Sequence, residues 1–318
     1  MNIIYGRSGV GKSEYIYNKI KSEIDVCTKT YIITPEQFSF TAEKKLLDTL
    51  EEGAVTKVEV ISFQRMAYRV IKEVIGSNIQ NLLQSDKAMM ISQLLEEYQK
   101  ELNFLGKSME NIELILTEIT EFKKHGITVQ MLQNQIENIK DNYLKLKLQD
   151  MLLIYSKFEE KIPDNYIDEN DLLTLLTENI EKSHLFDNSI FYIDEFAGFT
   201  KQEYMVIQSI LNIAKDVYIT VCTDSLETIK KPESDIFYDN KQTIQTLKSI
   251  GNIENKIYLD IPYRFKNEEL KHLEKNIFGM PYTSYEKKCG KHLFNNRKKS
   301  IWRNRKCSKR DSNIGKRT

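Results

Sequence analysis

The stretch Gly6-Arg7-Ser8-Gly9-Val10-Gly11-Lys12-Ser13 follows directly after the apolar run Ile3-Ile4-Tyr5, close to the first residue of the chain. It is a complete G-x(4)-G-K-[ST] phosphate-binding loop. Its glycines let the backbone curl, so that successive N–H groups point at phosphate oxygens and the following helix aims its positive end at the same charge. The stretch therefore predicts a strand, a loop and a helix from Glu14 to about Lys21, with a nucleotide bound at the loop.

Individual roles within the loop follow from this chemistry. The backbone of Gly6 to Ser13 is predicted to enclose the phosphates, with Lys12 reaching the β- and γ-phosphates and the Ser13 hydroxyl holding Mg²⁺. The predicted cofactors are therefore ATP and Mg²⁺. The alternative is a Gly-rich turn without a ligand.

A second motif supplies the other half of such a site. Ile190-Phe191-Tyr192-Ile193-Asp194-Glu195 is an apolar strand that ends in two acids, as in proteins that hold Mg²⁺ through a carboxylate at a strand end. Asp194 is the predicted metal residue, and Glu195 is the predicted catalytic residue that polarises an attacking water. An acid after a strand is otherwise a solvated turn, so both predictions depend on the phosphate loop upstream.

The rest of the chain predicts an α/β fold. Five segments rich in β-branched and aromatic residues are short enough to be buried strands: Asn2 to Tyr5, Thr30 to Thr34, Lys57 to Ser62, Ser189 to Asp194 and Asp216 to Cys222. The first two flank a helix, which predicts a parallel sheet. Apolar residues at three- and four-residue spacing predict three long helices: Asp86 to Leu102, Met109 to Lys124 and Asn142 to Glu160. The predicted domains are a core of 1–63 and 187–280, interrupted by a helical insertion of 64–186.

Composition limits the class of protein. The chain has 318 residues, 41% of them hydrophobic, without a run of eighteen apolar residues or an N-terminal signal pattern, so we expect a cytoplasmic protein with no membrane contact. The four cysteines show no C-x-x-C spacing, which argues against zinc, iron–sulfur or disulfide frameworks; they are Cys27, Cys222, Cys289 and Cys307. The four histidines are equally scattered.

The charge is unevenly distributed along the chain. Residues 287–318 carry thirteen Lys and Arg against the single acid Asp311, whereas residues 1–286 carry 33 basic and 45 acidic side chains. An acidic body cannot hold nucleic acid by diffuse attraction, so any such binding must use a local groove. The tail, 281–318, is expected to be unpacked. It is either a basic tail that grips nucleic acid or, as we favour, the product of a reading frame lost near Glu286.

Further stretches point to a known family. Ile32-Ile33-Thr34-Pro35-Glu36-Gln37-Phe38-Ser39 is similar to helicase motif Ia, and Val60-Ile61-Ser62-Phe63-Gln64-Arg65 is similar to the next DNA-facing motif. Ile261-Pro262-Tyr263-Arg264-Phe265 is similar to the segment that leads into a second helicase lobe. With the phosphate loop and Asp194 to Thr200, these stretches make Met1 to about Tyr285 resemble the N-terminal part of AddB-type subunits of the AddAB helicase-nuclease.

The resemblance implies the RecA-like sheet of a superfamily 1 helicase, lobe 1A, with a helical insertion like lobe 1B. It implies a heterodimer with an AddA-type motor subunit that acts on double-stranded DNA ends in homologous recombination, while the AddB-type partner scans single-stranded DNA for the Chi sequence. Family members are several times longer. Their nuclease domain, with its Mg²⁺ carboxylates and iron–sulfur cysteines, has no counterpart here, so we expect no nuclease site and no iron–sulfur cluster.

Two departures from superfamily 1 motors bear on turnover. The five residues before Gly6 leave no room for the adenine-reading glutamine, and the lobe that supplies a catalytic arginine would only begin near Arg264. We therefore expect nucleotide binding with little or no hydrolysis. Whether the chain is an enzyme stays open at this point.

The resemblance also implies DNA-facing residues at the predicted strand ends. They are Gln37, Ser39, Phe63, Arg65, Tyr68 and Phe199. Aromatic rings can stack on bases, Arg65 can pair with a phosphate or a base edge, and Gln37 can bind an exposed base. The alternative places Phe63 and Tyr68 in the core.

Two other functions remain as alternatives. One is a non-catalytic scaffold in which ATP only braces the interface with the partner subunit. The other is an unrelated P-loop kinase or ATPase whose helical block is a substrate lid. ATP turnover with and without single-stranded DNA separates the three.

Overall fold

The computed structural model describes residues 1–23, 29–50, 55–105, 109–163, 165–227, 235–277 and 283–285. Cys27, Asp164 and the basic segment 286–318 lie outside the described residues. The chain divides into two units, Met1–Arg264 and Phe265–Thr318. Among the described residues, the second unit holds the helix α11 (Glu268–Asn276), and the first holds the sheet and the other helices.

The first unit is built on a parallel six-stranded sheet with the strand order β3-β2-β6-β7-β1-β8. Its strands are β1 (Asn2–Gly6), β2 (Thr30–Ile33), β3 (Val58–Ile61), β6 (Ile190–Ile193), β7 (Asp216–Cys222) and β8 (Asn255–Tyr258). The α/β fold and the five predicted strands are confirmed. The edge strand β8 was not predicted, because three of its four side chains are exposed and its sequence lacks an apolar run.

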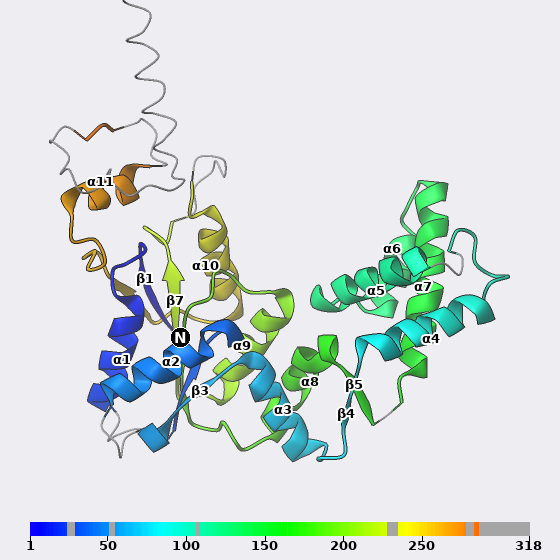
Figure 1. The fold of residues 1–318 in the computed structure, drawn as a ribbon, viewed down its shortest axis with the longest axis horizontal. Coiled ribbons are helices and arrows are strands. Elements are labelled where there is room, and N and C mark those ends of the chain that lie inside the picture. Colours follow the sequence, from blue (N-terminus) through cyan, green and yellow to red (C-terminus); the bar gives the residue numbers. More distant parts are fainter. Residues whose placement is uncertain are drawn as a thin grey trace, which may run out of the picture. The chain divides into compact units, whose positions relative to one another are not determined.

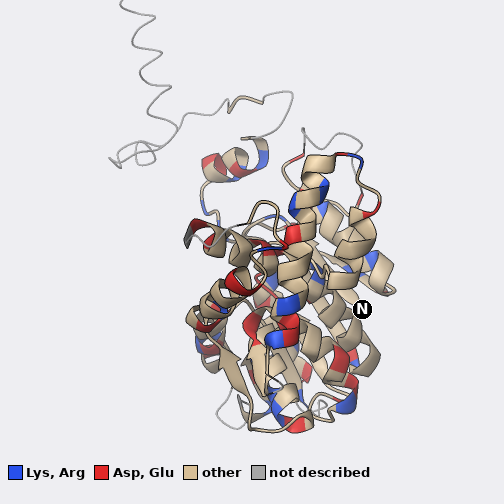
Figure 2. Ribbon diagram, turned by 90° about the vertical axis from the view of Figure 1, so that its right-hand side faces the viewer, with Lys and Arg blue, Asp and Glu red and all other residues tan. Residues whose placement is uncertain are grey.

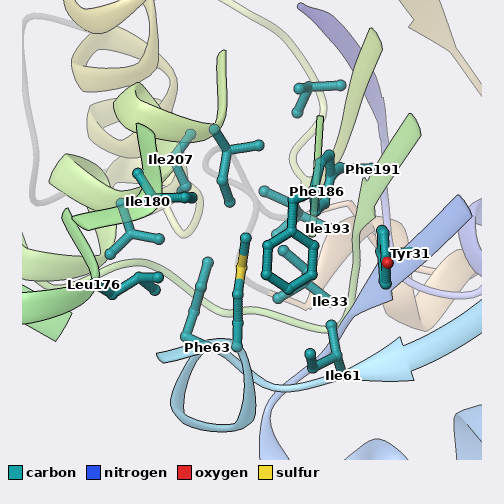
Figure 3. Close-up of a cluster of buried hydrophobic side chains, with 14 of the residues drawn as sticks. Tyr31, Ile33, Ile61, Phe63, Leu176, Ile180, Phe186, Phe191, Ile193 and Ile207 are labelled. Atoms are coloured by element: carbon teal, nitrogen blue, oxygen red, sulfur yellow. The ribbon is translucent and has the colours of Figure 1, made fainter. Parts of the chain in front are cut away.

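Helices cover both faces of this sheet (Figure 1), and side chains of the inner strands alternate between the two buried faces. Ile4 packs with residues of α1 (Lys12–Glu23) and α2 (Glu36–Thr49), whereas its neighbour Ile3 packs on the opposite face. That second face is covered by α3 (Phe63–Val74), α8 (Leu172–Asn179), α9 (Lys201–Ile213) and α10 (Tyr238–Ile250). Figure 3 shows strand residues such as Ile33 and Ile193 in one cluster with Leu176 and Ile180. Burial on both faces explains why these strands are apolar along their whole length.

Four further helices form a second hydrophobic core, which we call the helical arm. They are α4 (Gln84–Glu97), α5 (Met109–Lys124), α6 (Val129–Ile136) and α7 (Asn142–Lys161). Side chains such as Ile91, Ile115 and Phe158 are buried there. The spacing of apolar residues had predicted three of these helices, but not the short α6.

Two short strands, β4 (Gln80–Leu82) and β5 (Tyr166–Asp168), pair in parallel. β4 precedes the helical arm in the sequence and β5 follows it. After β5, the Asp168 side chain accepts a hydrogen bond from the Asn170 backbone N–H and caps the 3-10 turn Glu169–Asp171. The flanking helices α3 and α8 pack on the sheet, in the cluster of Figure 3. The division into a core and an insertion at 64 and 186 stays a proposal.

Because all six strands are parallel, their carboxyl ends lie on one edge of the sheet, here called the carboxyl edge. The phosphate loop follows β1, and Asp194 follows β6 at the same edge. β7 alone separates these two strands. The topology therefore brings together two motifs that are about 180 residues apart in the sequence, the position at which open parallel sheets bind ligands.

Candidate nucleotide-binding site

The phosphate loop connects β1 directly to α1, and its glycines are required by the backbone geometry. Gly9 and Gly11 have φ angles of 82° and 84°, the left-handed region that glycine adopts readily. A Cβ at Gly6 would clash with the carbonyl oxygen of Leu259. The loop is therefore a tight turn that other residues at these positions would distort.

Within this loop Lys12 folds back on the backbone. Its Nζ donates hydrogen bonds to the carbonyl oxygens of Gly6 at 2.9 Å and Arg7 at 3.0 Å. Burial lowers the pKa of Lys12 below its ordinary value, although the negative charges of Asp194 and Glu195 act in the opposite direction. The ammonium group thus lies at the loop, near two carboxylates, in a position to bind a phosphate held by the loop.

The two acids after β6 differ in environment. Asp194 is only 4% exposed, its backbone N–H donates to the carbonyl of Ile33, and its Oδ1 accepts a 2.6 Å hydrogen bond from the Thr220 hydroxyl. Glu195 is exposed, and its φ of 66° is unusual for a residue other than glycine. Its Oε1 accepts a 3.1 Å hydrogen bond from the Ser13 hydroxyl, so the structure brings the predicted metal and catalytic residues together.

These residues suit a magnesium ion that arrives with a nucleotide. Among the described residues, no group of three or more His, Cys, Asp or Glu side chains could hold a metal by itself. A phosphate-loop site needs fewer protein ligands: one hydroxyl and one carboxylate suffice, because phosphate oxygens and waters supply the other ligands of the Mg²⁺ ion. The Ser13 hydroxyl, which lies beside Glu195, and the carboxylate of the preceding Asp194 would provide such a donor set. Their roles nonetheless stay predictions.

Two further residues at the loop were not assigned to it from the sequence. The backbone N–H of Arg264 donates to the carbonyl of Gly9 at 3.1 Å, and its Nη1 donates to the Ser8 hydroxyl at 3.3 Å. The ring of Tyr263 comes within 3.4 Å of the place where a Cβ on Gly11 would lie. The sequence associated Arg264 only with the segment that leads into a second helicase lobe, yet this arginine lies against the phosphate loop. The sequence does contain the Tyr-Arg pair, but it does not show where this pair lies. Its position at the loop depends on a contact between residues more than 250 positions apart.

The predicted DNA-facing residues fall into two groups. Gln37, Arg65 and Tyr68 are exposed on α2 and α3, at the carboxyl ends of β2 and β3. Arg65 lies 3.6 Å from Glu43, an exposed ion pair that is readily exchanged for another partner. Arg65 and Tyr68 also line a cavity of about 580 Å³ between α2, α3 and β3, away from the phosphate loop. Ser39 is half-buried, and its hydroxyl has no hydrogen-bond partner among the described residues.

The second group consists of aromatic side chains in a row. The Phe63 and Phe196 ring centroids lie 5.4 Å apart, those of Phe196 and Phe199 5.1 Å, and those of Phe199 and Tyr204 5.5 Å. Phe63 is 4% exposed and belongs to the core of Figure 3, so a base cannot stack on it in this structure. The structure therefore places Phe63 in the core, the alternative that the sequence left open, with its ring against that of Phe196. Phe199 is half-buried and keeps part of its surface.

Charges of both signs are interspersed along the helices in Figure 2, without a broad basic face in that view. Two arginines of α3 are already paired, Arg65 with Glu43 and Arg69 with Glu59. Binding to DNA would therefore use individual side chains at the carboxyl edge rather than a diffuse field. In the part of the chain that the structure describes, no helix is both long and apolar enough to cross a membrane.

Comparison with known proteins assigns the family. The family model described as the N-terminal region of AddB matches residues 3–274. This chain belongs to the AddB N-terminal family. The resemblance inferred from the motifs is confirmed.

Curated relatives, each named as a subunit of an ATP-dependent helicase/deoxyribonuclease, are similar over most of the chain. A Clostridium botulinum protein (strain Loch Maree / Type A3) is 41% identical over 301 residues, and a Clostridium tetani protein is 39% identical over 304 residues. A Clostridium perfringens protein (strain 13 / Type A) is 35% identical over 301 residues. These matches cover 90–91% of this chain but only 26% of each relative. The chain therefore corresponds to about a quarter of an AddB protein.

Proposed function

We propose that this AddB region binds ATP with Mg²⁺ at the phosphate loop and presents the neighbouring carboxyl edge to single-stranded DNA. The observation that carries the proposal is the hydrogen bond between Ser13 and Glu195, which joins the phosphate loop to the acids after β6. Lys12 would move from the carbonyls of its own loop to the β- and γ-phosphates. Bound Mg²⁺ would neutralise phosphate charge there, with Ser13 and Asp194 as its protein partners.

Tyr263 and Arg264 extend this proposed site. The Tyr263 ring beside Gly11 offers an aromatic face near the entrance of the loop, and Arg264 adds a second cation beside Ser8. A nucleotide would thus meet positive charge from two directions, which favours tight binding. Glu195 is the proposed base for hydrolysis. Hydrolysis by a RecA-like motor also needs an arginine from a second lobe, so we propose that the residues of this sheet by themselves bind ATP with little turnover.

Single-stranded DNA would lie across the carboxyl ends of β2, β3 and β6. Gln37, Arg65, Tyr68 and Phe199 are at least partly accessible there, and Ser39 lies between them on α2. Arg65 would exchange Glu43 for a phosphate or a base edge, and the rings would stack on bases. Phe63 would act indirectly, by holding Phe196 and, through it, Phe199.

The wider setting follows from the family. We propose that the full-length protein pairs with an AddA-type subunit and that the heterodimer acts in the cytoplasm on double-stranded DNA ends during homologous recombination, with this region scanning for Chi. The Clostridium botulinum relative is named as a subunit of an ATP-dependent helicase/deoxyribonuclease, which supports a role in ATP-dependent DNA processing. The family match argues against an unrelated P-loop kinase.

The DNA proposal is tested in the complete heterodimer with the variant Arg65→Ala. Loss of one charge-assisted contact should weaken single-strand binding by about tenfold and reduce the response to Chi. Arg69→Ala is the matched control, because Arg69 lies on the same helix but is held by Glu59. Unchanged binding and Chi response in Arg65→Ala would refute the assignment.

The scaffold alternative predicts different kinetics. If ATP only braces the interface with AddA, this region binds ATP but single-stranded DNA leaves its turnover unchanged. Hydrolysis stimulated by DNA would instead indicate an active motor. The comparison requires a partner subunit whose own phosphate loop has been inactivated, so that turnover at this site alone is measured.

A further inference from the structure

We propose that Thr220 positions Asp194 for the magnesium ion of a bound nucleotide, an inference that rests on the proposed nucleotide site. Thr220 lies in β7, the strand between the acid and the phosphate loop. Its hydroxyl donates to Oδ1 of Asp194 at 2.6 Å, with both side chains buried. Thr220 thus contacts the predicted metal residue directly.

The register of the sheet explains why this position is suited to the task. Thr220 pairs with Ile4 of β1, and its neighbour Ile219 pairs with Ile193, the last residue of β6. Ile219 and Val221 belong to the hydrophobic cluster on the face covered by α3, α8, α9 and α10. Because successive side chains of a strand alternate, Thr220 points to the opposite face, toward α1. A side chain at this position can reach across to the residue that follows β6.

The hydrogen bond has a specific geometric effect. A carboxylate that follows a strand can rotate about its side-chain bonds, and each rotation moves the oxygen that would face a metal-bound water. Donation from Thr220 to Oδ1 fixes the plane of the carboxylate and leaves Oδ2 for the ligand. A threonine is stiff at its first side-chain bond, so the hydroxyl itself is held in place.

A hydrophobic residue would fit this strand equally well. The other buried positions of β7 are Val217, Tyr218, Ile219 and Val221. Of these only Tyr218 carries a polar group, and its hydroxyl donates to Asp216 rather than to Asp194. β-Branched residues suit a buried parallel strand. Within the described part of the chain, the hydroxyl at position 220 finds its partner in Asp194. We infer that the polar group serves the acid rather than the packing of the sheet.

The test measures binding of ATP to the full chain at increasing Mg²⁺ concentration and in EDTA, for wild type, Thr220→Val and Thr220→Ser. Positioning groups behind a metal ligand are typically worth 10–100-fold in metal affinity. Thr220→Val should therefore require about tenfold more Mg²⁺ to reach full ATP affinity, with unchanged affinity in EDTA. Thr220→Ser keeps the hydroxyl and should restore most of the Mg²⁺ response.

Thermal unfolding of each variant without ligand controls for folding. Thr177→Val is the matched control, because it removes a hydroxyl that donates to the Leu173 carbonyl within α8. A folded Thr220→Val variant with the Mg²⁺ response of wild type would overturn the inference. If Thr220→Val does not fold, Thr220→Ala replaces it, and a wild-type Mg²⁺ response in that variant likewise overturns it. Failure of wild type to bind ATP would instead refute the proposed nucleotide site.

Discussion

The helical arm and the carboxyl edge of the sheet differ in the partners of their lysine side chains. At the base of the arm, buried Lys123 is paired with Asp171 at 2.6 Å, Glu159 at 2.8 Å and Asp168 at 3.0 Å. At the carboxyl edge, Lys12 is bound only by carbonyls of its own loop in the hydrogen bonds that the structure gives, and Ser13 by an exposed glutamate. A charged group surrounded by opposite charges of its own protein is structural, whereas one that rests on backbone carbonyls is available for a ligand.

The sharpest test of this difference is Lys123→Met. Removal of one partner from a buried ion cluster leaves uncompensated carboxylates, so the free energy of unfolding should fall by about 3–5 kcal/mol. The neighbouring Lys124 is exposed and pairs with Glu121, and Lys124→Met should cost less than about 1 kcal/mol. Urea denaturation compares the two, and equal losses would show that the cluster is not structural.

Lys12→Ala should give the reverse pattern. The affinity for ATP should fall by about 100-fold, because a charge-assisted contact with phosphate is lost. The free energy of unfolding should change by less than about 1 kcal/mol. Calorimetric titration with ATP measures the first quantity and urea denaturation the second. Lys21→Ala, an exposed residue in the last turn of the same helix, is the control and should leave both unchanged.

Asp150 is a second buried polar side chain of the helical arm whose partners all belong to the protein. Its carboxylate accepts backbone hydrogen bonds from Asn103, Phe104 at 2.7 Å and Leu105 at 3.2 Å. Burial acts to raise the pKa of Asp150, but these hydrogen bonds outweigh it and hold the pKa below its ordinary value. Asp150→Asn should therefore lower the free energy of unfolding by about 2 kcal/mol at pH 7.

The sign of the pH dependence follows from the lowered pKa. Because the folded protein binds this proton less readily than the unfolded chain, the stabilisation is complete above about pH 4 and is lost as the pH falls further. Wild type and Asp150→Asn should therefore converge in stability at acidic pH. Asp141→Asn is the control, since asparagine also caps helices well. A constant difference between pH 7 and pH 3 would contradict the interpretation.

The smallest expected effect concerns the backbone at Glu195. A left-handed conformation costs a residue other than glycine or asparagine about 1 kcal/mol. Glu195→Gly should therefore raise the free energy of unfolding by about 0.5–1 kcal/mol. Asn188, at a φ of 52°, already tolerates this region, and Asn188→Gly should change little. A destabilised Glu195→Gly variant would show that the Ser13 contact outweighs the strain.

The sequence predicted those parts of the molecule that depend on local pattern. The phosphate loop, the apolar inner strands and the long amphipathic helices all carry such patterns. The edge strand β8 carries no such signal, because three of its four side chains are exposed. The strands β4 and β5 carry none because each has only three residues, too few to show an alternation. Tyr263 and Arg264 reach the loop through a contact that no local pattern encodes.

The burial of Phe63 could have been predicted from the spacing of apolar residues in α3. Phe63, Met66, Ala67 and Val70 recur at three- and four-residue spacing and are all buried, whereas Arg65, Tyr68 and Arg69 form the exposed face of the same helix. The helical period thus separates core from surface within the motif. The position of Phe63 after a strand end had suggested a ligand contact, but its face of the helix decides its burial.

The most direct measurement is the affinity for ATP, with Mg²⁺ and with EDTA, of wild type and Asp194→Asn. If the phosphate loop and Asp194 share one magnesium nucleotide, Mg²⁺ strengthens binding to wild type and this gain is largely lost in Asp194→Asn, while both bind equally in EDTA. Absence of ATP binding to wild type, or an undiminished Mg²⁺ gain in Asp194→Asn, would contradict the proposed site.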